Sequence, residues 1–496
     1  MRVRHWRRLG LVGLFAAGVA GPTFAQPPLN PAAVPAPGPS LNSGESVIDL
    51  ATALRLAGVQ NPQLLLARER VTEALAVRQL VAAQALPNVN AGLNYDLHRG
   101  PLQQAAGNVL NVNRDALYVG LGANAVGAGT VNVPGVSYNV NPVTGRYDYL
   151  RAKQLVARAA AAARTSENDT LLRVCLAYTE SVRAEARVAV VRQNRAEAAE
   201  LVRLTTAYAK AGQGRQADAD RATVELRKRD ADAAQADADA AIAAARLGQL
   251  LSLDPAVRLR PADTTAVPIA AVPDPVPVAD LVAIALMMRP ELEERRAEIR
   301  ESVYALSSAK VLPFSPTVVL GFSTGSFGGG SDLVSQGPAA TGPRFGDFGG
   351  RVDFDAAVVF TLQNLGVGNV AQVRGAASRA RQADFRRQET FNRVRAEVVE
   401  ADARTRARLK QIDAAADAVA AGRAAYAQDL ARIKGREGLP IEVIDSLRLL
   451  ARARNEYLDA ITEYNRSQFQ LYVAIGRPPA DALARPAPPP ATPVAK

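Results

Sequence analysis

The motif most suggestive of catalysis in this 496-residue sequence is Gly321–Gly325, which reads GFSTG. Its spacing matches the G-x-S-x-G nucleophile elbow, in which a serine on a sharp strand-to-helix turn attacks an acyl carbon. Here the serine belongs to a strand-like segment, no helix follows it, and neither His5 nor His98 lies downstream as that triad order requires. We therefore expect no enzyme activity.

Other residues that could bind a cofactor or a metal are isolated from one another. Gly328–Gly330 is glycine-rich but is not followed by the Gly-Lys-Ser/Thr of a phosphate-binding loop. The single cysteine, Cys175, excludes an internal disulfide, and its apolar neighbours predict a packed thiol rather than a reactive one. One histidine, His98, cannot form a metal cluster alone. The sequence therefore predicts no cofactor and no metal site.

The charge of the chain does not indicate nucleic-acid binding. There are 59 basic and 48 acidic residues, and four of the basic ones lie in a predicted export signal, which leaves a net charge of +7. Residues of both signs are interleaved, as in Arg227–Asp232, which reads RKRDAD. A nucleic-acid surface requires a basic stripe instead.

The first 25 residues predict a cleavable signal peptide. Four arginines precede the apolar stretch Leu9–Gly21, and Thr23-Phe24-Ala25 offers a small-x-small cleavage site. The stretch is shorter than the roughly 20 residues that span a bilayer as a helix, so we expect removal and export. Residues 26–45 and 477–496 are rich in proline, and we expect both to be disordered.

The most informative feature of the sequence is an internal repeat. We place the first copy at residues 46–276 and the second at residues 277–476. A helical stretch begins at Pro62 in the first copy and at Pro290 in the second, and each ends in a Leu-Pro pair. Proline suits the first turn of a helix because its missing N–H would have no partner there. Two such matches at nearly one offset indicate tandem repeats.

Each Leu-Pro pair is followed by side chains that alternate between apolar and polar. We predict strands near 88–98, 136–141, 316–323 and 353–362. Aromatic residues on the apolar faces and polar residues opposite are typical of strands with lipid on one side and water on the other. A half-buried soluble sheet is the alternative. The register of the first copy stays open because 117–123 is a second candidate; we favour 136–141, which leads directly into a helix.

The rest of each copy predicts a long helix and a shorter return helix. Long helices near 148–212 and 368–434 would each be roughly 100 Å long at about 1.5 Å per residue. Turns at Gly212-Gln213-Gly214 and Gly435–Pro440 reverse the chain. The first return helix has alanines at steps of three and four, which predict close packing with a neighbouring helix. These are Ala231, Ala234, Ala238, Ala241 and Ala245.

In this order, twice over, the elements resemble the TolC-like outer-membrane efflux proteins over nearly the whole mature chain. Gly438–Ser446 (GLPIEVIDS) is similar to the family's turn and the DVLDA start of its return helix. Asn465–Leu471 and Ile475-Gly476 resemble the family's C-terminal end. The resemblance implies an α+β membrane protein of two tandem repeats. Its four strands per chain would join those of two other subunits in a trimeric twelve-stranded β-barrel, and its long antiparallel helices would form a periplasmic α-barrel.

The resemblance also implies a function. Members of the family are outer-membrane channels that act as the passive exit duct of a tripartite efflux or type I secretion system. The expected partners are a homotrimer, outer-membrane lipid, a periplasmic adaptor (membrane fusion) protein and an inner-membrane pump. We expect the protein in the outer membrane, extending into the periplasm. An envelope-spanning structural coiled coil without a pore is the alternative.

Two sites follow from the resemblance. The first is the pair of hairpin tips, which dock onto the adaptor in the family; turn formation alone would also account for their glycines. The tip residues are Gly212, Gly214, Gly435, Gly438 and Leu439.

The second site is Glu442 with Asp445, which match the family's acidic pair at the pore constriction. Three subunits would present two acidic rings that favour cations. Acidic residues near a helix N-terminus also stabilise the helix dipole, which is the structural alternative.

Overall fold

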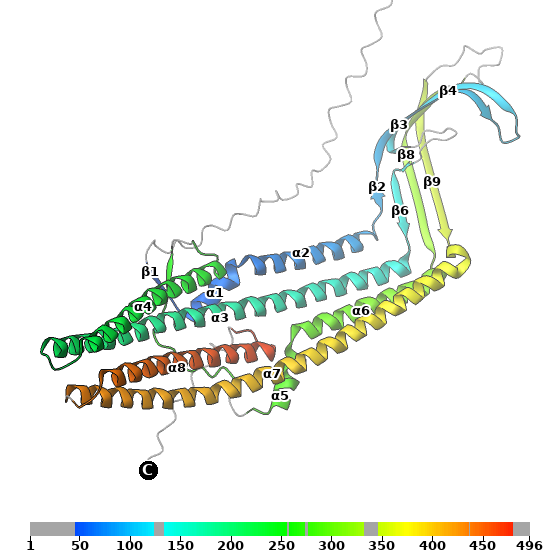
Figure 1. The fold of residues 1–496 in the computed structure, drawn as a ribbon. Coiled ribbons are helices and arrows are strands. Elements are labelled where there is room, and N and C mark those ends of the chain that lie inside the picture. The colour runs from blue at the N-terminus through cyan, green and yellow to red at the C-terminus, as the bar shows by residue number, and fades with distance from the viewer. Residues whose placement is uncertain are drawn as a thin grey trace, which may run out of the picture.

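The computed structural model describes residues 45–123, 133–254, 257–272, 276–331, 346–435 and 437–479. The predicted signal peptide, nearly all of the proline-rich segment after it and most of the C-terminal tail lie outside these ranges. The described residues form an α+β fold. Long helices lie side by side, and a curved antiparallel sheet rises from one end of them (Figure 1).

The two repeats contain helices of the same order and nearly the same length. Those of repeat one are α1 (Leu50–Gln60), α2 (Pro62–Ala83), α3 (Pro142–Lys210) and α4 (Gln216–Leu250). Those of repeat two are α5 (Val278–Met288), α6 (Pro290–Val311), α7 (Val367–Lys434) and α8 (Pro440–Ala474). Both α2 and α6 have 22 residues, both α4 and α8 have 35, and α3 and α7 have 69 and 68.

Asparagine-proline pairs start two helices of repeat one. The side chain of Asn141 accepts a hydrogen bond from the backbone N–H of Thr144 at 3.1 Å, and Pro142 follows it. The side chain of Asn61 accepts one from the N–H of Gln63 at 2.9 Å, again before a proline. Such caps satisfy N–H groups that have no partner inside the helix. The cap at Asn141 explains why α3 begins at Pro142 rather than near residue 148.

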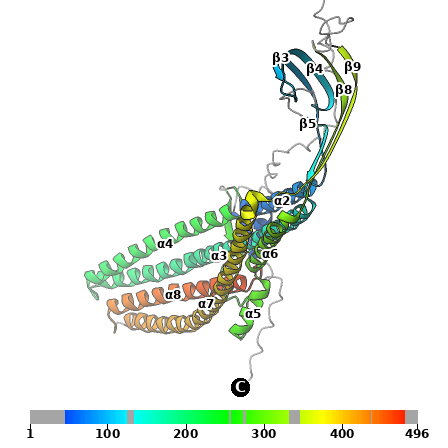
Figure 2. The same cartoon turned by 90° about the vertical axis from the view of Figure 1, so that its right-hand side faces the viewer.

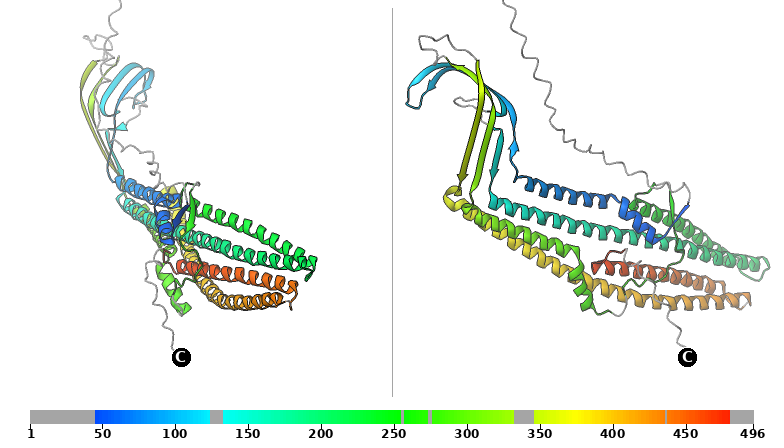
Figure 3. Two further views of the ribbon diagram at one scale, coloured as in Figure 1. Left: turned by 90° about the vertical axis from the view of Figure 1, so that its left-hand side faces the viewer. Right: turned by 180° about the vertical axis from the view of Figure 1, so that it is seen from behind.

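The helices form one curved layer. In the half near the sheet, the order across the layer is α2, α3, α6, α7. In the far half, α4 continues beyond α2 and α8 beyond α6, so that the order is α4, α3, α8, α7 (Figures 2 and 3). The layer therefore has two different edges, which are α2 with α4 on one side and α7 on the other.

Buried apolar clusters hold the layer together. Near its middle, Val174 of α3 lies in a cluster with residues of α1, α4 and α8. The equivalent cluster of repeat two surrounds Val398 of α7 and includes residues of α5, α6 and α8. A third cluster, around Leu201 and Leu447, joins the far ends of α3, α4, α7 and α8. The two hairpins of one chain therefore share a core.

The alanines that pack α4 onto α3 are not the ones in the predicted stripe. Ala236 of α4 is buried against Val188 and Val191 of α3. Every member of the predicted stripe is exposed in the single chain, namely Ala231, Ala234, Ala238, Ala241 and Ala245. The expectation of close packing is therefore wrong for these residues within one chain.

The sheet is antiparallel throughout. Its strands are β2 (Asn88–Val89), β3 (Ala91–Gln103), β4 (Val109–Ala123), β5 (Val133–Pro134), β6 (Val136–Val140), β8 (Thr317–Ser331) and β9 (Gly346–Val359). A separate parallel pair, β1 (Glu45–Ile48) and β7 (Arg258–Pro261), lies beside the helices.

Both strand candidates of repeat one are strands. Along β8, residues 318–322 pair with β6 and residues 324–331 pair with β4. Thus β4 and β6 lie end to end in one position, and the order across the sheet is β2 with β3, then β4 with β6, then β8, then β9. The strand that we favoured at 136–141 is β6, and it leads into α3. The segment 117–123 that we set aside is also a strand, because it belongs to β4 and shares one strand position with β6.

The two faces of the sheet differ as the alternation predicted. Val89, Val136, Phe322 and Phe354 are successive cross-strand neighbours and form an apolar row on one face. Large apolar side chains on this face are exposed, for example Leu93 at 70%. Neighbouring rows carry polar residues on the other face, where Ser323 lies opposite Asp353 and Asp96 pairs with Arg114 at 3.3 Å.

One glycine pair sets how closely two strands approach. A Cβ atom on Gly120 of β4 would lie 2.5 Å from the Cα atom of Gly325 on β8. Only glycine permits this contact between the strands. Among the helices that the structure describes, none is both long and apolar enough to cross a membrane.

Candidate functional site

The two hairpin tips lie side by side at the end of the layer opposite the sheet (Figures 1 and 3). The first tip joins α3 to α4, and the second joins α7 to α8. The hydroxyl of Tyr208 in α3 donates a hydrogen bond to the carbonyl of Ile433 in α7 at 3.3 Å, which connects the tips directly. With the shared core around Leu201 and Leu447, this bond places both tips in one site.

Gly212 ends α3 in a left-handed conformation, with φ of +70°. The N–H of Gly212 donates to the carbonyl of Ala209, and the N–H of Gln213 donates to that of Tyr208 at 2.9 Å. These two bonds make a Schellman motif, in which glycine is favoured because it has no Cβ atom. Gly212 therefore forms the turn through a conformation that glycine adopts without strain.

The other three tip glycines do not have a positive φ. Gly214 and Gly438 are instead close to the helix that each follows. A Cβ atom on Gly214 would lie 3.1 Å from Cβ of Tyr208, and one on Gly438 would lie 3.0 Å from Cβ of Arg432. Gly435 is the C-cap of α7 with φ of −78°. The turns at these three glycines therefore do not depend on a left-handed conformation.

A groove of about 610 Å³ separates the two tips. Tyr208, Gln213 and Gly214 line one side, and Gly438, Leu439 and Ile441 line the other. Leu439 is 62% exposed, although its side chain is apolar. Arg215, Asp218 and Arg221 surround this apolar strip with charge. The groove can therefore accept a chain segment that combines apolar and charged side chains.

The two acidic residues of the predicted constriction have different surroundings. The Glu442 carboxylate accepts a hydrogen bond from the backbone N–H of Leu439 at 3.3 Å and pairs with Arg432 at the same distance. It closes the first turn of α8 and joins that turn to the end of α7. Glu442 therefore caps the N-terminus of α8.

Asp445 lies on the exposed side of α8. Its side chain is 64% exposed, and its nearest cation is Arg448, one turn later, at 3.8 Å. Ile444, which precedes it, and Leu447, two residues after it, are buried in the tip core. Asp445 is thus the member of the pair whose carboxylate faces solvent in the single chain.

The sequence analysis missed a buried ion-pair network that connects the two hairpins. The carboxylate of Glu225 in α4 is 1% exposed. It accepts hydrogen bonds from Arg229 at 2.6 Å and from Nε of Arg448 in α8 at 2.9 Å. Because an unpaired buried charge is costly, the two arginines compensate for the burial of this carboxylate.

Arg454 of α8 makes the second connection. One guanidinium nitrogen donates to Asn194 at 2.5 Å and to Glu197 at 2.8 Å, and the other donates to Glu197 at 2.8 Å. Both acceptors belong to α3. Burial, followed by the nearby Glu197 carboxylate, raises the pKa of Tyr426 in the adjoining core to about 12. A charged residue within the apolar face of the predicted return helix was the signal that could have found Arg454.

Ser323 and Cys175, which were considered above for chemistry, are both buried and packed in the structure. The hydroxyl of Ser323 is buried in β8 and accepts a hydrogen bond from the N–H of Gly135 at 3.2 Å. Burial raises the pKa of the Cys175 thiol to about 12, so the thiol carries no charge at neutral pH. The described ranges contain no group of three or more acidic, histidine or cysteine residues suited to a metal ion.

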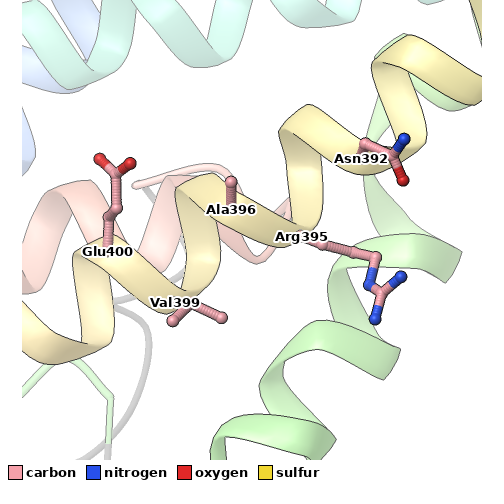
Figure 4. Close-up of a pocket in the computed structure, with 5 residues that line it drawn as sticks. All are labelled: Asn392, Arg395, Ala396, Val399 and Glu400. Atoms are coloured by element: carbon pink, nitrogen blue, oxygen red, sulfur yellow. The ribbon is translucent and has the colours of Figure 1, made fainter.

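A second hollow lies on α7 alone. Asn392, Arg395, Ala396, Val399 and Glu400 line a space of about 380 Å³ beside that helix (Figure 4). These side chains point in several directions from one helix and do not converge on a common point (Figure 4). The hollow therefore belongs to the uncovered edge of the helical layer, and it has no enclosing walls of its own.

Comparison of the sequence with protein-family models and with curated proteins gives no match. Solved structures do match. The outer-membrane channel OprN has a TM-score of 0.67 at 21% identity, covering 87% of this chain and 90% of that one. The Campylobacter jejuni CmeC outer membrane channel has a TM-score of 0.69 at 15% identity, with 86% and 85% covered. The open state of the Neisseria gonorrhoeae MtrE outer membrane channel has a TM-score of 0.63 at 18% identity, with 86% and 89% covered. This chain therefore has the fold of the TolC-like outer-membrane channels.

Proposed function

We propose that this protein is the outer-membrane channel of a tripartite efflux or type I secretion system. It would conduct its cargo passively from a periplasmic adaptor and an inner-membrane pump to the exterior. The observation that carries the proposal is the pair of unequal open edges, which one chain cannot satisfy by itself. We infer no catalytic role, in line with the channel fold.

The helical layer needs a second copy at each edge. In one chain α3 lies between long helices on both sides, whereas its equivalent in repeat two, α7, has α6 and α8 on one side and only the short α5 as a further helical neighbour. The uncovered side of α7 exposes apolar residues such as Phe385 and Val399, and the opposite edge exposes Leu66 and Leu80 of α2. Because the two edges differ, they can join head to tail and close into a ring.

The sheet has the same property. Among the described strands, β2 and β3 lie at one edge of the sheet and β9 lies at the other. Exposed edges of this kind pair readily with another strand. Joining β9 of one copy to β3 of the next gives four strand positions per subunit, and three subunits would close a twelve-stranded barrel, the number that the family resemblance implies.

The apolar face of the sheet supports a location in the outer membrane. Leu93, Val352, Phe354 and Val358 are all more than 60% exposed in the single chain. Burying such side chains in lipid is favourable, and the polar face opposite would then line a water-filled lumen. On this proposal, the helices extend into the periplasm and the tips lie farthest from the membrane.

The groove between the tips supports docking of the adaptor. Its exposed Leu439 and the charged rim around Arg215 and Arg221 fit a helical hairpin with an apolar end and acidic flanks. A photo-crosslinking residue at Leu439 should therefore capture the adaptor in cells, whereas one at Leu80 of α2 should not. Capture from Leu80 alone would reject this docking site.

Asp445 supports a cation-selective constriction. Three copies would bring three exposed carboxylates to one level of the duct, and a ring of carboxylates attracts cations and repels anions. Glu442 would contribute less, because Arg432 already pairs with it.

Conductance of the purified protein in planar lipid bilayers tests the proposal. A channel should give discrete current steps of uniform size. A protein that inserts but never conducts would favour the poreless structural coiled coil instead.

A further inference from the structure

The return helices of the two repeats, α4 and α8, end in the same way. Adding 224 to a residue number converts the last residue of α4 into the last residue of α8, and both helices have 35 residues. The backbone N–H groups of residues 251–253 donate to carbonyls in the last turns of α4, and those of residues 475–477 make the equivalent bonds to α8. Ser252 and its equivalent Gly476 both have a positive φ, of 55° and 84°. The chain therefore leaves both helices in the same direction.

After α4 the chain continues into β7, whose Leu259 packs in the core of repeat one. Leu259 is 5% exposed and belongs to the buried cluster that contains Val174. Other members of this cluster come from the segment before α1, from α1, from α3 and from α4. They include Ile48, Ala53, Tyr178, Val182 and Leu247. Leu259 therefore joins the return helix to the elements that surround it.

Repeat two has a groove at the equivalent place, lined by α7, α8, α5 and the segment before α5. The shift is 224 for residues of α3 and α4, and it is 228 for α1, which that shift converts into α5 over all 11 residues. Applied to the five cluster members above, these shifts give five residues that line the groove. They are Val276, Leu281, Asp402, Arg406 and Leu471. We call this groove the tail groove.

The residue equivalent to Leu259 is Leu483, which lies outside the described ranges. Residues 255–262 read PAVRLRPA, and residues 479–487 read PADALARPA. The shift of 224 aligns the Pro-Ala pair and the leucine of both segments. Arg-Pro-Ala follows in each, one residue later in the second. The sequence after α8 therefore repeats that of β7 and its flanks.

Charges at the tail groove match charges in this second segment. In repeat one, Val257 packs against the cluster that contains Val182. Their equivalents in repeat two are Asp481 and Arg406, so two apolar residues are replaced by two of opposite charge. The side chain of Arg406 is 49% exposed beside the groove, where it pairs with Asp402 of its own helix at 3.0 Å. It can therefore bind a further carboxylate.

We propose that residues 479–487 dock into the tail groove of the same chain, with Leu483 in the place equivalent to that of Leu259 and Asp481 beside Arg406. Pro479, where the described chain ends, is buried against the helices. Four residues separate Pro479 from Leu483, a reach of up to about 14 Å, and four also separate Pro255 from Leu259. The disorder expected from the proline content would then apply to residues 488–496. The proposal goes beyond the channel function and does not depend on it, because both partners belong to one chain.

Reactivity of single cysteines tests whether Leu483 is covered. In a Cys175→Ala background, Leu483→Cys in the full chain should react with a water-soluble maleimide at least about tenfold more slowly than Thr492→Cys, because docking protects a side chain from solvent until it opens locally. Leu259→Cys is the reference for a covered position in β7. If Leu483→Cys reacted as fast as Thr492→Cys while Leu259→Cys stayed protected, docking would be overturned.

A charge exchange tests the contact between Asp481 and Arg406. Arg406→Asp should raise the reactivity of Leu483→Cys at least about fivefold, because it places two carboxylates side by side. Adding Asp481→Arg should restore the protection. The matched control is Arg404→Asp, which changes an exposed arginine of the same helix and should leave the reactivity unchanged. Protection that is insensitive to Arg406→Asp, or that Asp481→Arg does not restore, would overturn this contact.

A disulfide tests whether the segment docks within its own chain. Leu409 also lines the tail groove and is 37% exposed. Oxidation of Leu483→Cys with Leu409→Cys should give a product at the mass of one chain on a non-reducing denaturing gel. Covalent dimers or trimers would show that the segment binds the groove of a second copy, and they would overturn the assignment to the same chain.

Discussion

The guanidinium of Arg454 and the carboxylate of Glu197 form two parallel hydrogen bonds, each 2.8 Å long, that tie the last helix of repeat two to the long helix of repeat one. The Arg454 side chain is 8% exposed. Bidentate pairs of this kind fix orientation as well as adding energy. The relationship makes the two hairpins of a chain one structural unit.

Removing this pair should destabilise the protein. We expect Arg454→Ala to lower the free energy of unfolding by about 1.5–3 kcal/mol, because hydrogen bonds to charged groups are lost and Glu197 loses its cation. Arg452, two residues earlier, is the matched control, since its pair with Glu456 is exposed. Arg452→Ala should leave the free energy of unfolding nearly unchanged, because exposed ion pairs contribute little. Equal changes in melting temperature would contradict the role given to Arg454.

The turn at Gly212 gives a prediction about backbone conformation. Gly212→Ala should lower stability by about 1–2 kcal/mol, because a residue with a Cβ atom is strained at φ of +70°. Gly145→Ala in the first turn of α3 should be neutral or stabilising, since no atom lies within 4 Å of the added Cβ. Thermal unfolding of the two variants compares them. A loss for Gly145→Ala that equals the loss for Gly212→Ala would show that helix glycines in general, and not this conformation, are responsible.

Glu298 makes part of the stability depend on pH. Burial pushes the pKa of Glu298 up, but hydrogen bonds from Arg295 of α6 and Arg386 of α7 outweigh it and leave that pKa below its ordinary value of 4.5. The ionised carboxylate therefore stabilises the fold above pH 4.5, and this contribution is lost as the pH falls through the lowered pKa.

Glu298→Gln should accordingly melt at a lower temperature than the unsubstituted protein at pH 7, and the difference should shrink as the pH falls below 4.5. The exposed Glu389→Gln is the control and should follow the unsubstituted protein at every pH. A difference that stays constant across this range would mean that the Glu298 carboxylate makes no pH-dependent contribution.

Asp445 and Glu442 should affect ion selectivity unequally. Asp445→Asn should shift the reversal potential in a potassium chloride gradient toward zero, because an exposed carboxylate is removed from the duct. Glu442→Gln should shift it less, since Arg432 neutralises that side chain. If the double variant kept both the cation selectivity and the conductance of the unsubstituted channel, the acidic constriction would have to be abandoned.

Much of the fold could be predicted from the sequence, because it follows from local signals. Asn61-Pro62 marks a helix start that the structure contains, and the alternation around Phe354 predicted an apolar face that the structure exposes. The end-to-end placement of β4 and β6 could not be predicted in this way, since it depends on which residues of β8 each strand meets. Periodicity in one segment carries no information about that register.

The same limit applies to the candidate site. Residue types at the tips predicted turns, yet the left-handed conformation of Gly212 and the close contacts of Gly214 follow from how each turn packs on its own helix. The pairing of Glu225 with Arg448 joins residues more than 200 positions apart in the sequence. Such contacts become visible only when the two hairpins are placed side by side.

The mass of the detergent-solubilised particle from the outer-membrane fraction tests the central claim most directly. Four strand positions and one helical layer with two open edges need further copies to close. The account predicts a stable particle with three times the mass of one chain. A monomer, or a protein found only in the soluble periplasmic fraction, would contradict it.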